Sequence, residues 1–235
     1  MLLQDQLDAI TVNTRKLVQA DRLAISEQAT TDLFNTGIED CILPVGATAP
    51  TFALQDALTG KLVRSTDLLA LGPLVICFFR GRWDPYCVTE LEAWRDLQPE
   101  LRRLGALFVA ISPQTPRQND FTRQQHALPF PLLADPGATH AEQFHLAYTI
   151  PPSHRPYYHS ILINIPFNNA GLINIPFNNA GLNYHNATDA SWRLPLPATF
   201  VLDQNNVIIF SEGHADFRVR PEPTEVIAAL ARCNS

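Results

Sequence analysis

The sequence predicts an α/β protein with helices on both faces of a β-sheet. Two apolar runs, 74–80 and 106–112, have the length and unbroken hydrophobicity of buried parallel strands. Between them, apolar side chains recur at helical spacing from Cys87 to Leu104. Strand and helix patterns continue to alternate after these three elements, which favours this class over an all-α or all-β fold.

Composition indicates the size and class of the protein. The chain has 235 residues, enough for one domain of about 150 to 200 residues and an appendage. Apolar residues make up 46% and charged residues 17%, which allows a large core and excludes bulk disorder. A net charge of −6 without a basic cluster excludes nucleic acid and an anionic membrane as main partners. Because no export signal and no apolar run of about 18 residues is seen, we expect a cytoplasmic protein.

The N-terminal part carries an apolar stripe at helical spacing over residues 2–36. We expect a helical extension over 1–40 and one domain over 41–235. The stripe needs a surface that buries it, either its own domain or a second copy in a homodimer. The other expected elements are strands at 51–54, 61–65, 131–134, 198–203 and 207–210 and helices at 115–126, 135–144 and 223–232.

A helix is expected to begin at Asp84, because aspartate followed by proline is a helix-start signal. It should end at Gly105, and Pro99 inside it predicts a kink near Arg95. Glu90 lies in an early turn of this helix, where its negative charge interacts favourably with the helix dipole. We also expect it to pair with a nearby arginine.

Cys87 is the candidate nucleophile. As the third residue of this helix it lies near unpaired backbone N–H groups and the positive end of the dipole, which lower a cysteine pKa. Arg80 and Arg82, just upstream, add positive charge. Asp84 allows two interpretations: an N-cap whose charge the backbone N–H groups absorb, or a negative charge that raises the thiol pKa.

The other cysteines, Cys41, Cys77 and Cys233, form no Cys-x-x-Cys pair, so free thiols are expected. Cys77 lies mid-strand and is expected to act as a small buried hydrophobe. Seven histidines include no His-x-x-x-His pair and no phosphate-binding loop is present, so neither a metal site nor a cofactor is expected.

Residues 162–171 are repeated letter for letter as 172–181. Two copies are too few for a solenoid. We interpret 162–181 as a tandem duplication that lengthens a surface loop without adding chemistry, since the cost of loop closure grows only with the logarithm of length. Two identical copies can also compete for one structural position.

Six short motifs occur in the order seen in the peroxiredoxin (alkyl hydroperoxide reductase/thiol-specific antioxidant) family. They are Ala49–Leu54, the strand ending at Arg80, Cys87–Leu91, Val109–Ser112, Phe130–Asp135 and Pro197–Asp203. Over residues 40–232 the chain resembles this family, and above all a branch whose strand–helix junction reads Arg-Gly-Gly-Trp-Cys-Pro-Tyr-Cys. The resemblance implies a thioredoxin-like fold, with a central mixed β-sheet flanked by helices, and puts Pro197 where that fold often has a cis-proline.

The resemblance also implies an antioxidant oxidoreductase, a peroxidase that reduces hydroperoxides. Its cysteine attacks the peroxide as thiolate, becomes a sulfenic acid and is regenerated by an external thiol, thioredoxin-like or small. Matching Cys-x-Thr-Glu-Leu assigns that role to Cys87. Arg80, Arg82 and Asp84 are then the other candidate catalytic residues.

Three departures from the family pattern concern the site. The family has Thr or Ser three residues before the cysteine and Pro seven before it, where this chain has Asp84 and Arg80. The related branch has cysteine at the position of Asp84, so a dithiol is missing. The family's arginine before the late strand is replaced by Pro197, and Arg193 is four residues further back.

Three functions therefore stay open: a one-cysteine peroxidase, a general disulfide reductase, and a catalytically weakened or inactive thioredoxin-fold protein for binding or redox sensing. The missing Cys-x-x-Cys pair argues against the second.

Overall fold

The computed structural model describes residues 2–170, 177–178, 181–182 and 192–233. Within them a seven-stranded sheet has the order β11-β10-β3-β4-β5-β1-β2. Its centre is parallel and consists of β3 (Leu74–Phe78), β4 (Leu107–Ser112) and β5 (Leu132–Ala134). One edge is extended antiparallel by β10 (Ala198–Leu202) and β11 (Ile208–Gly213), the other by β1 (Ala53–Asp56) and β2 (Leu62–Arg64). The predicted mixed sheet is confirmed.

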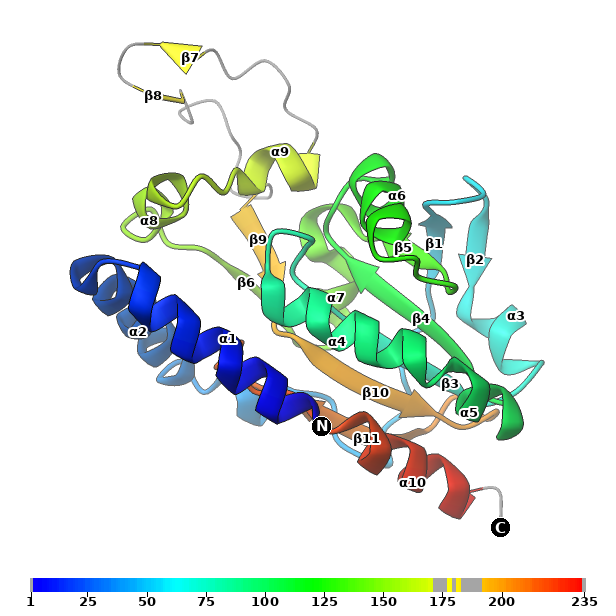
Figure 1. Cartoon of the computed structure of the whole chain (residues 1–235). Coiled ribbons are helices and arrows are strands. Elements are labelled where there is room, and N and C mark those ends of the chain that lie inside the picture. The colour runs from blue at the N-terminus through cyan, green and yellow to red at the C-terminus, as the bar shows by residue number, and fades with distance from the viewer. Residues whose placement is uncertain (1, 171–176, 179–180, 183–191, 234–235) are drawn as a thin grey trace.

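Helices cover both faces of this sheet, and Figure 1 shows α4 (Pro85–Asp96) and α5 (Gln98–Arg103) lying across β3 and β4. Alternate residues of β3 point to opposite faces, so Ile76 and Phe78 join one buried cluster and Val75 and Cys77 the other. The cluster with Cys77 also contains side chains of α4, α5 and α10 (Pro223–Cys233). The opposite cluster contains side chains of α3 (Ser65–Leu69) and α7 (Thr139–Gln143).

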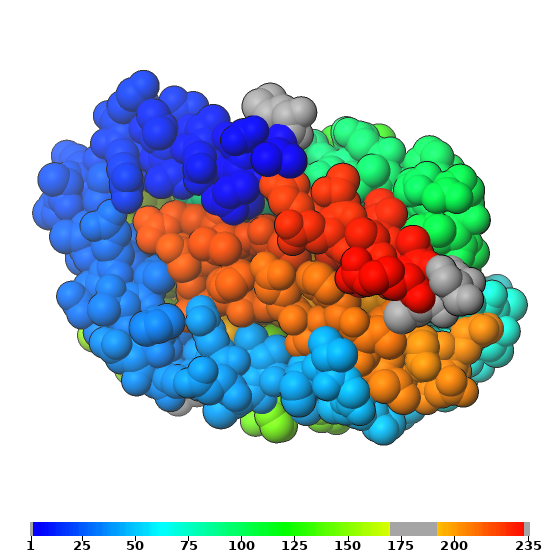
Figure 2. All heavy atoms as spheres, turned by 90° about the horizontal axis from the view of Figure 1, so that it is seen from below, coloured from blue at the N-terminus to red at the C-terminus, as the bar shows by residue number. Residues whose placement is uncertain are grey.

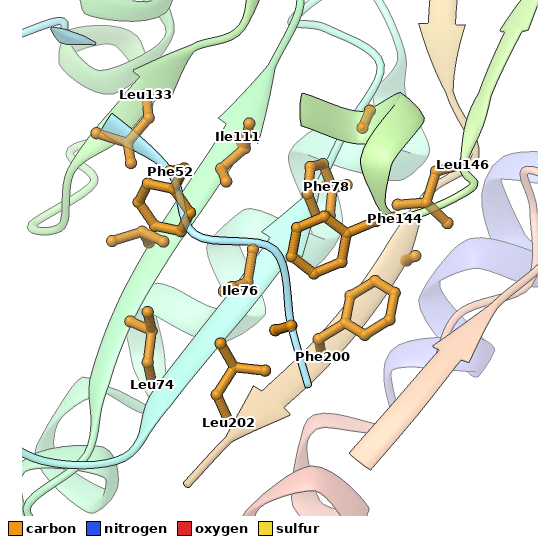
Figure 3. Packing of buried hydrophobic residues seen from close by; sticks show 14 of the residues in the cluster. Phe52, Leu74, Ile76, Phe78, Ile111, Leu133, Phe144, Leu146, Phe200 and Leu202 are labelled. Carbon is orange, nitrogen blue, oxygen red and sulfur yellow. The ribbon is translucent and has the colours of Figure 1, made fainter. Parts of the chain in front are cut away.

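Three phenylalanines occupy the middle of the core on the face away from α4 (Figure 3). The ring centroid of Phe144, just after α7, is 5.1 Å from that of Phe78 and 5.0 Å from that of Phe200. All three rings are fully buried. They join β3, β10 and the end of α7 into one packing unit, as tilted aromatic pairs commonly do.

The N-terminal stripe forms two helices, α1 (Leu3–Leu17) and α2 (Ala20–Phe34), followed by the 3-10 helix η1 (Ile38–Cys41). Leu3 and Leu7 are buried against Tyr86 of α4, and the Glu222 carboxylate accepts from the backbone N–H groups of Leu3 and Gln4 at 3.0 and 2.8 Å. Figure 2 shows the helices beside the chain that follows β11 and leads into α10. The stripe is therefore buried in part on its own chain, while the homodimer stays a prediction.

The long helix expected over 84–105 is two helices, so the prediction of a kink near Arg95 is wrong. Leu97, with φ −94° and ψ 4°, separates α4 from α5. Pro99 then lies in the first turn of α5, where the missing N–H costs nothing. The break is therefore one residue wide and precedes the proline.

The helix expected over 135–144 is also divided, into the 3-10 helix η2 (Pro136–Ala138) and α7. The Asp135 carboxylate accepts from the backbone N–H groups of His140 and Ala141, each at 3.0 Å, and so caps α7. Helix α6 (Pro116–Gln125) forms as expected and contacts β5. The peptide bond before Pro197 is trans.

Outside the main sheet, β6 (Ala147–Thr149) and β9 (Arg193–Pro195) pair antiparallel. Between them the described elements are α8 (Arg155–Ser160), α9 (Ile165–Ala170), β7 (Phe177–Asn178) and β8 (Gly181–Leu182). The first copy of the duplicated decapeptide contains α9, and its Ile165 is buried with Ile150 and Trp192. Most of the second copy lies outside the described residues, so the interpretation of 162–181 as a lengthened loop stays a prediction.

Replacing Phe144 by alanine is expected to lower the free energy of unfolding by about 3–5 kcal/mol, because a fully buried ring in contact with two others is lost. The matched control is Phe34→Ala on α2, whose side chain is exposed and which should cost less than about 0.5 kcal/mol. Urea unfolding of both variants gives the comparison. Equal losses would contradict the assignment of Phe144 to the core.

Candidate active site

The junction between β3 and α4 is a tight turn. Gly81 has φ +152°, and a Cβ added there would lie 2.6 Å from Nε1 of Trp83, so the turn requires glycine. Asp84 then caps α4: its Oδ1 accepts from the backbone N–H of Tyr86 at 3.0 Å, and Pro85 begins the helix. The predicted N-cap is confirmed, and Cys87 is the third residue of α4.

The Cys87 thiol is fully buried and has three polar neighbours. The backbone N–H of Arg80 and the Nη2 of Arg220 each donate toward Sγ at 3.4 Å. Sγ in turn donates to Oδ2 of Asp84 at 3.0 Å. Two positively polarised groups and one carboxylate therefore converge on one sulfur atom.

Arg80 forms a buried ion pair with Asp84, with 2.7 Å between Nε and Oδ2. Its guanidinium carbon lies 4.0 Å from the ring centroid of Phe217 and 5.0 Å from that of Trp83. The same Asp84 oxygen thus accepts from both Arg80 and Cys87. Arg80, Asp84 and Cys87 are brought together as the sequence predicted.

Arg220 was missed by the sequence analysis. Its Nε lies 2.6 Å from Oε2 of Glu90 in a second buried ion pair, and its Nη1 donates to the carbonyls of Phe217 and Val219. Glu90 pairs with an arginine as expected, but that arginine is 130 residues away along the chain and not nearby in the sequence. Local pattern gives no signal for a contact at that separation.

Two other arginines considered from the sequence have different partners. The Nε of Arg82 donates to Oε1 of Gln118 at 3.0 Å, and its guanidinium lies over the Phe121 ring. Arg193 pairs with Glu142 at 2.9 Å. Of the arginines after β5, Arg220 is the one whose side chain donates toward Cys87 among the described residues.

Burial raises the pKa of the Cys87 thiol to about 12, and the negative charge of Asp84 adds to the rise. Arg220, Arg80 and the Arg80 backbone N–H lower this pKa but do not offset the rise. The second interpretation of Asp84, a negative charge that raises the thiol pKa, is thus supported beside the N-cap, and the influences expected to lower that pKa are outweighed because a fully buried thiolate loses its hydration. Burial alone would raise the pKa of Asp84 as well, but Arg80 and Arg220 hold it below its ordinary value.

Two cavities of about 230 and 200 Å³ lie next to these residues. Both are lined by Arg80, Phe217, Tyr157 and Tyr158 on one side and by α2 on the other, and the second is also lined by Asp84. The site therefore has an interior space that the N-terminal helices cover.

Among the described residues, no group of three or more His, Cys, Asp or Glu side chains is arranged to hold a metal ion. In the same part of the chain, no helix combines the length and hydrophobicity needed to cross a membrane.

A model of the AhpC/TSA family matches residues 45–211. The chain belongs to the AhpC/TSA family. A curated relative is the protein named Putative peroxiredoxin bcp of Coxiella burnetii, 32% identical over 103 residues that cover 43% of this chain and 66% of that protein. Another is Alkyl hydroperoxide reductase E of Mycobacterium bovis, 33% identical over 94 residues that cover 40% and 61%. The matched part thus spans less than two thirds of the length of these AhpC/TSA relatives.

Solved structures show the same fold. Peroxidoxin BcpB from Mycobacterium tuberculosis superposes with a TM-score of 0.58 at 22% identity, covering 82% of this chain and 99% of that one. Peroxiredoxin Q from Xanthomonas campestris gives a TM-score of 0.53 at 17% identity, covering 79% and 92%. The predicted thioredoxin-like fold is confirmed. Helices α1 and α2 precede the segment that matches the AhpC/TSA family.

Asp84→Asn is expected to lower the pKa of Cys87 below about 12, because a like charge is removed and asparagine still caps a helix. Alkylation of the thiol at pH 7 should then be about tenfold faster or more. Asp96→Asn, at an exposed carboxylate near the end of the same helix, is the control and should leave the rate unchanged. A rate in Asp84→Asn at or below the native one would contradict the assigned effect of the carboxylate.

Arg220→Met is expected to lower the free energy of unfolding by about 3–5 kcal/mol, because Glu90 is left buried without a cation. Adding Glu90→Leu removes both charges and should restore most of that loss. Alkylation of Cys87 should be slower in both variants than in the native protein, since each lacks the Arg220 donor. Recovery of the alkylation rate together with stability in the double variant would show that Arg220 has only a structural role.

Proposed function

We propose that this protein is a thiol peroxidase of the one-cysteine type, in which Cys87 reduces a hydroperoxide and an external thiol regenerates it. The observation that carries the proposal is the pair of donors, the Arg80 N–H and Arg220 Nη2, that converge on Sγ of Cys87. Such donors stabilise negative charge on sulfur and on the peroxide oxygens as the O–O bond breaks. The similarity to proteins named peroxiredoxin supports the same conclusion.

In the first step the Cys87 thiol loses its proton to water, and the Arg80 N–H and Arg220 Nη2 stabilise the thiolate that forms. The sulfur then attacks the outer oxygen of the hydroperoxide, an S–O bond forms and the O–O bond breaks. The leaving alkoxide takes a proton from water, so the products are an alcohol and a cysteine sulfenic acid. Asp84 caps α4 at the position where the family has a hydroxyl side chain, and its charge, held ionised by Arg80 and Arg220, opposes formation of the thiolate.

Regeneration uses two molecules of an external thiol, thioredoxin-like or small. The first condenses with the sulfenic acid to a mixed disulfide and water, and the second releases the Cys87 thiol and leaves with the first as a disulfide. An external reductant is supported by the positions of two other cysteines: Cys77 is fully buried in β3, and Cys41 is exposed on η1. A reducing cytoplasm would maintain these free thiols.

The second candidate is a weakened peroxidase that serves as a binding or redox-sensing module. The observation that favours it is the full burial of the Cys87 thiol against the Asp84 carboxylate, which raises the thiol pKa to about 12 and leaves only a very small thiolate fraction at pH 7. Under the first proposal, the two donors on Sγ stabilise the charge that develops during the reaction, so that this small thiolate fraction is productive. Under the second, the thiol reacts only under strongly oxidising conditions.

Treatment with about one equivalent of hydrogen peroxide and a sulfenic-acid trap is expected to give a mass adduct confined to Cys87. The adduct should be absent in Cys87→Ser, while Cys41→Ser serves as the control and should match the native protein. The initial rate should rise with pH, up to about tenfold for each pH unit below the thiol pKa, because the thiolate is the nucleophile. No adduct at neutral pH, or one spread over the other cysteines, would reject the peroxidase and favour the second candidate.

A further inference from the structure

The two cavities beside the site share one set of walls. The first lies between α2 and the segment of β6 and α8, and the second between α1, α2 and the start of α4. Ser26 of α2 lines both, as do Arg80, Phe217, Tyr157 and Tyr158. A change at one position of α2 therefore alters both spaces.

The walls are mainly aromatic and apolar. In addition to the shared rings of Phe217, Tyr157 and Tyr158, the first cavity is lined by Tyr148 and the second by Trp83 and Tyr86. Trp83 and Tyr158 are in edge contact, with ring centroids 5.8 Å apart. Aromatic walls favour an aromatic guest. Each cavity exceeds the size of about 150 Å³ that holds a benzene molecule.

Charged groups that line the cavities are paired with other protein groups. Arg80 pairs with Asp84 at 2.7 Å. At the level of α2, Arg15 of α1 pairs with Glu27 at 3.5 Å, and Asp32 lies 3.6 Å from His154. A guest with a net charge would have to displace one of these partners or lose its hydration without gaining a new one. The cavities therefore suit a neutral guest.

The inner wall of the second cavity is one side chain away from the thiol. Asp84 lines this cavity, and its Oδ2 is 3.0 Å from Sγ of Cys87. Arg80 lines both cavities, and its backbone N–H points at the same sulfur. Cys87 lines neither cavity, so a hydroperoxide group reaches Sγ only when the Arg80–Asp84 pair moves aside, while the organic part stays between the rings.

From these observations we infer that the two cavities bind the organic part of a neutral arylalkyl hydroperoxide, and that α2 selects this substrate class over hydrogen peroxide and over anionic lipid hydroperoxides. The inference rests on the proposed function. The aromatic walls at Trp83, Tyr148, Tyr157 and Tyr158 lie within the family-matched residues 45–211, and α1 and α2, which lie outside them, close the cavities from the other side.

The test compares rates of Cys87 oxidation by cumene hydroperoxide, hydrogen peroxide and linoleic acid hydroperoxide in three proteins. These are the native chain, Ser26→Phe, which narrows both cavities, and Ala24→Phe at an exposed position of the same helix. In the native chain, cumene hydroperoxide should react about tenfold faster than the other two. Ser26→Phe should slow that reaction about tenfold and change the hydrogen peroxide rate less than about twofold, whereas Ala24→Phe changes neither.

Equal native rates for cumene hydroperoxide and hydrogen peroxide, or equal slowing of both in Ser26→Phe, would overturn the inference and leave the peroxidase intact. Absence of oxidation by every peroxide would instead reject the proposed function. In that case calorimetric binding of 2-phenylpropan-2-ol, the alcohol product, still tests the cavities. Binding to the native chain that Ser26→Phe abolishes supports the site, and no binding to the native chain rejects it.

Discussion

Charges removed from water must be paired, and this constraint determines how the site is built. Asp84 and Glu90, at the start and in the middle of α4, are each about 1% exposed. Their cations, Arg80 and Arg220, come from the end of β3 and from the segment before α10. The sheet, α4 and the C-terminal segment must therefore come together for either carboxylate to be buried at low cost. Cys87 lies where the two ion pairs meet.

Because the two pairs cancel, the sulfur lies in surroundings with two positive and two negative side chains. Burial then decides the balance, and it favours the protonated thiol. A protonated thiol reacts slowly with oxidants, since the thiolate is the reactive form. The same arrangement keeps donors in position for the moment when charge develops during reaction. The same geometry thus keeps the Cys87 thiol protonated before the reaction and holds hydrogen-bond donors in position to stabilise the charge that develops during it.

Local features of the site could be predicted from the sequence because short-range rules determine them. The Asp84 cap and the place of Cys87 on α4 follow from adjacent residues. Arg220 could not be found in this way, since only the folded chain brings it to Cys87, whereas Arg82, close to Cys87 in the sequence, donates to Gln118. The balance of influences on the thiol pKa stayed open in the sequence, because full burial is a property of packing. In the fold, alternating strand and helix patterns predicted a sheet with helices on both faces, and the family resemblance implied that the sheet is mixed, whereas the break at Leu97 was not predicted at that residue.

The duplicated decapeptide has a consequence for how this chain can vary. The dipeptide Phe-Asn lies in helix α9 at 167–168 and in strand β7 at 177–178. The structural context of this dipeptide, and not its residue identity, therefore determines its conformation. The first copy supplies Ile165 to the packing beside the site. Excision of one copy from the gene would leave an unbroken α9 sequence, and halving a connecting loop changes its closure cost by only about 0.6 kcal/mol. Descendants of this gene can therefore gain or lose ten codons here while the residues around Cys87 are inherited unchanged.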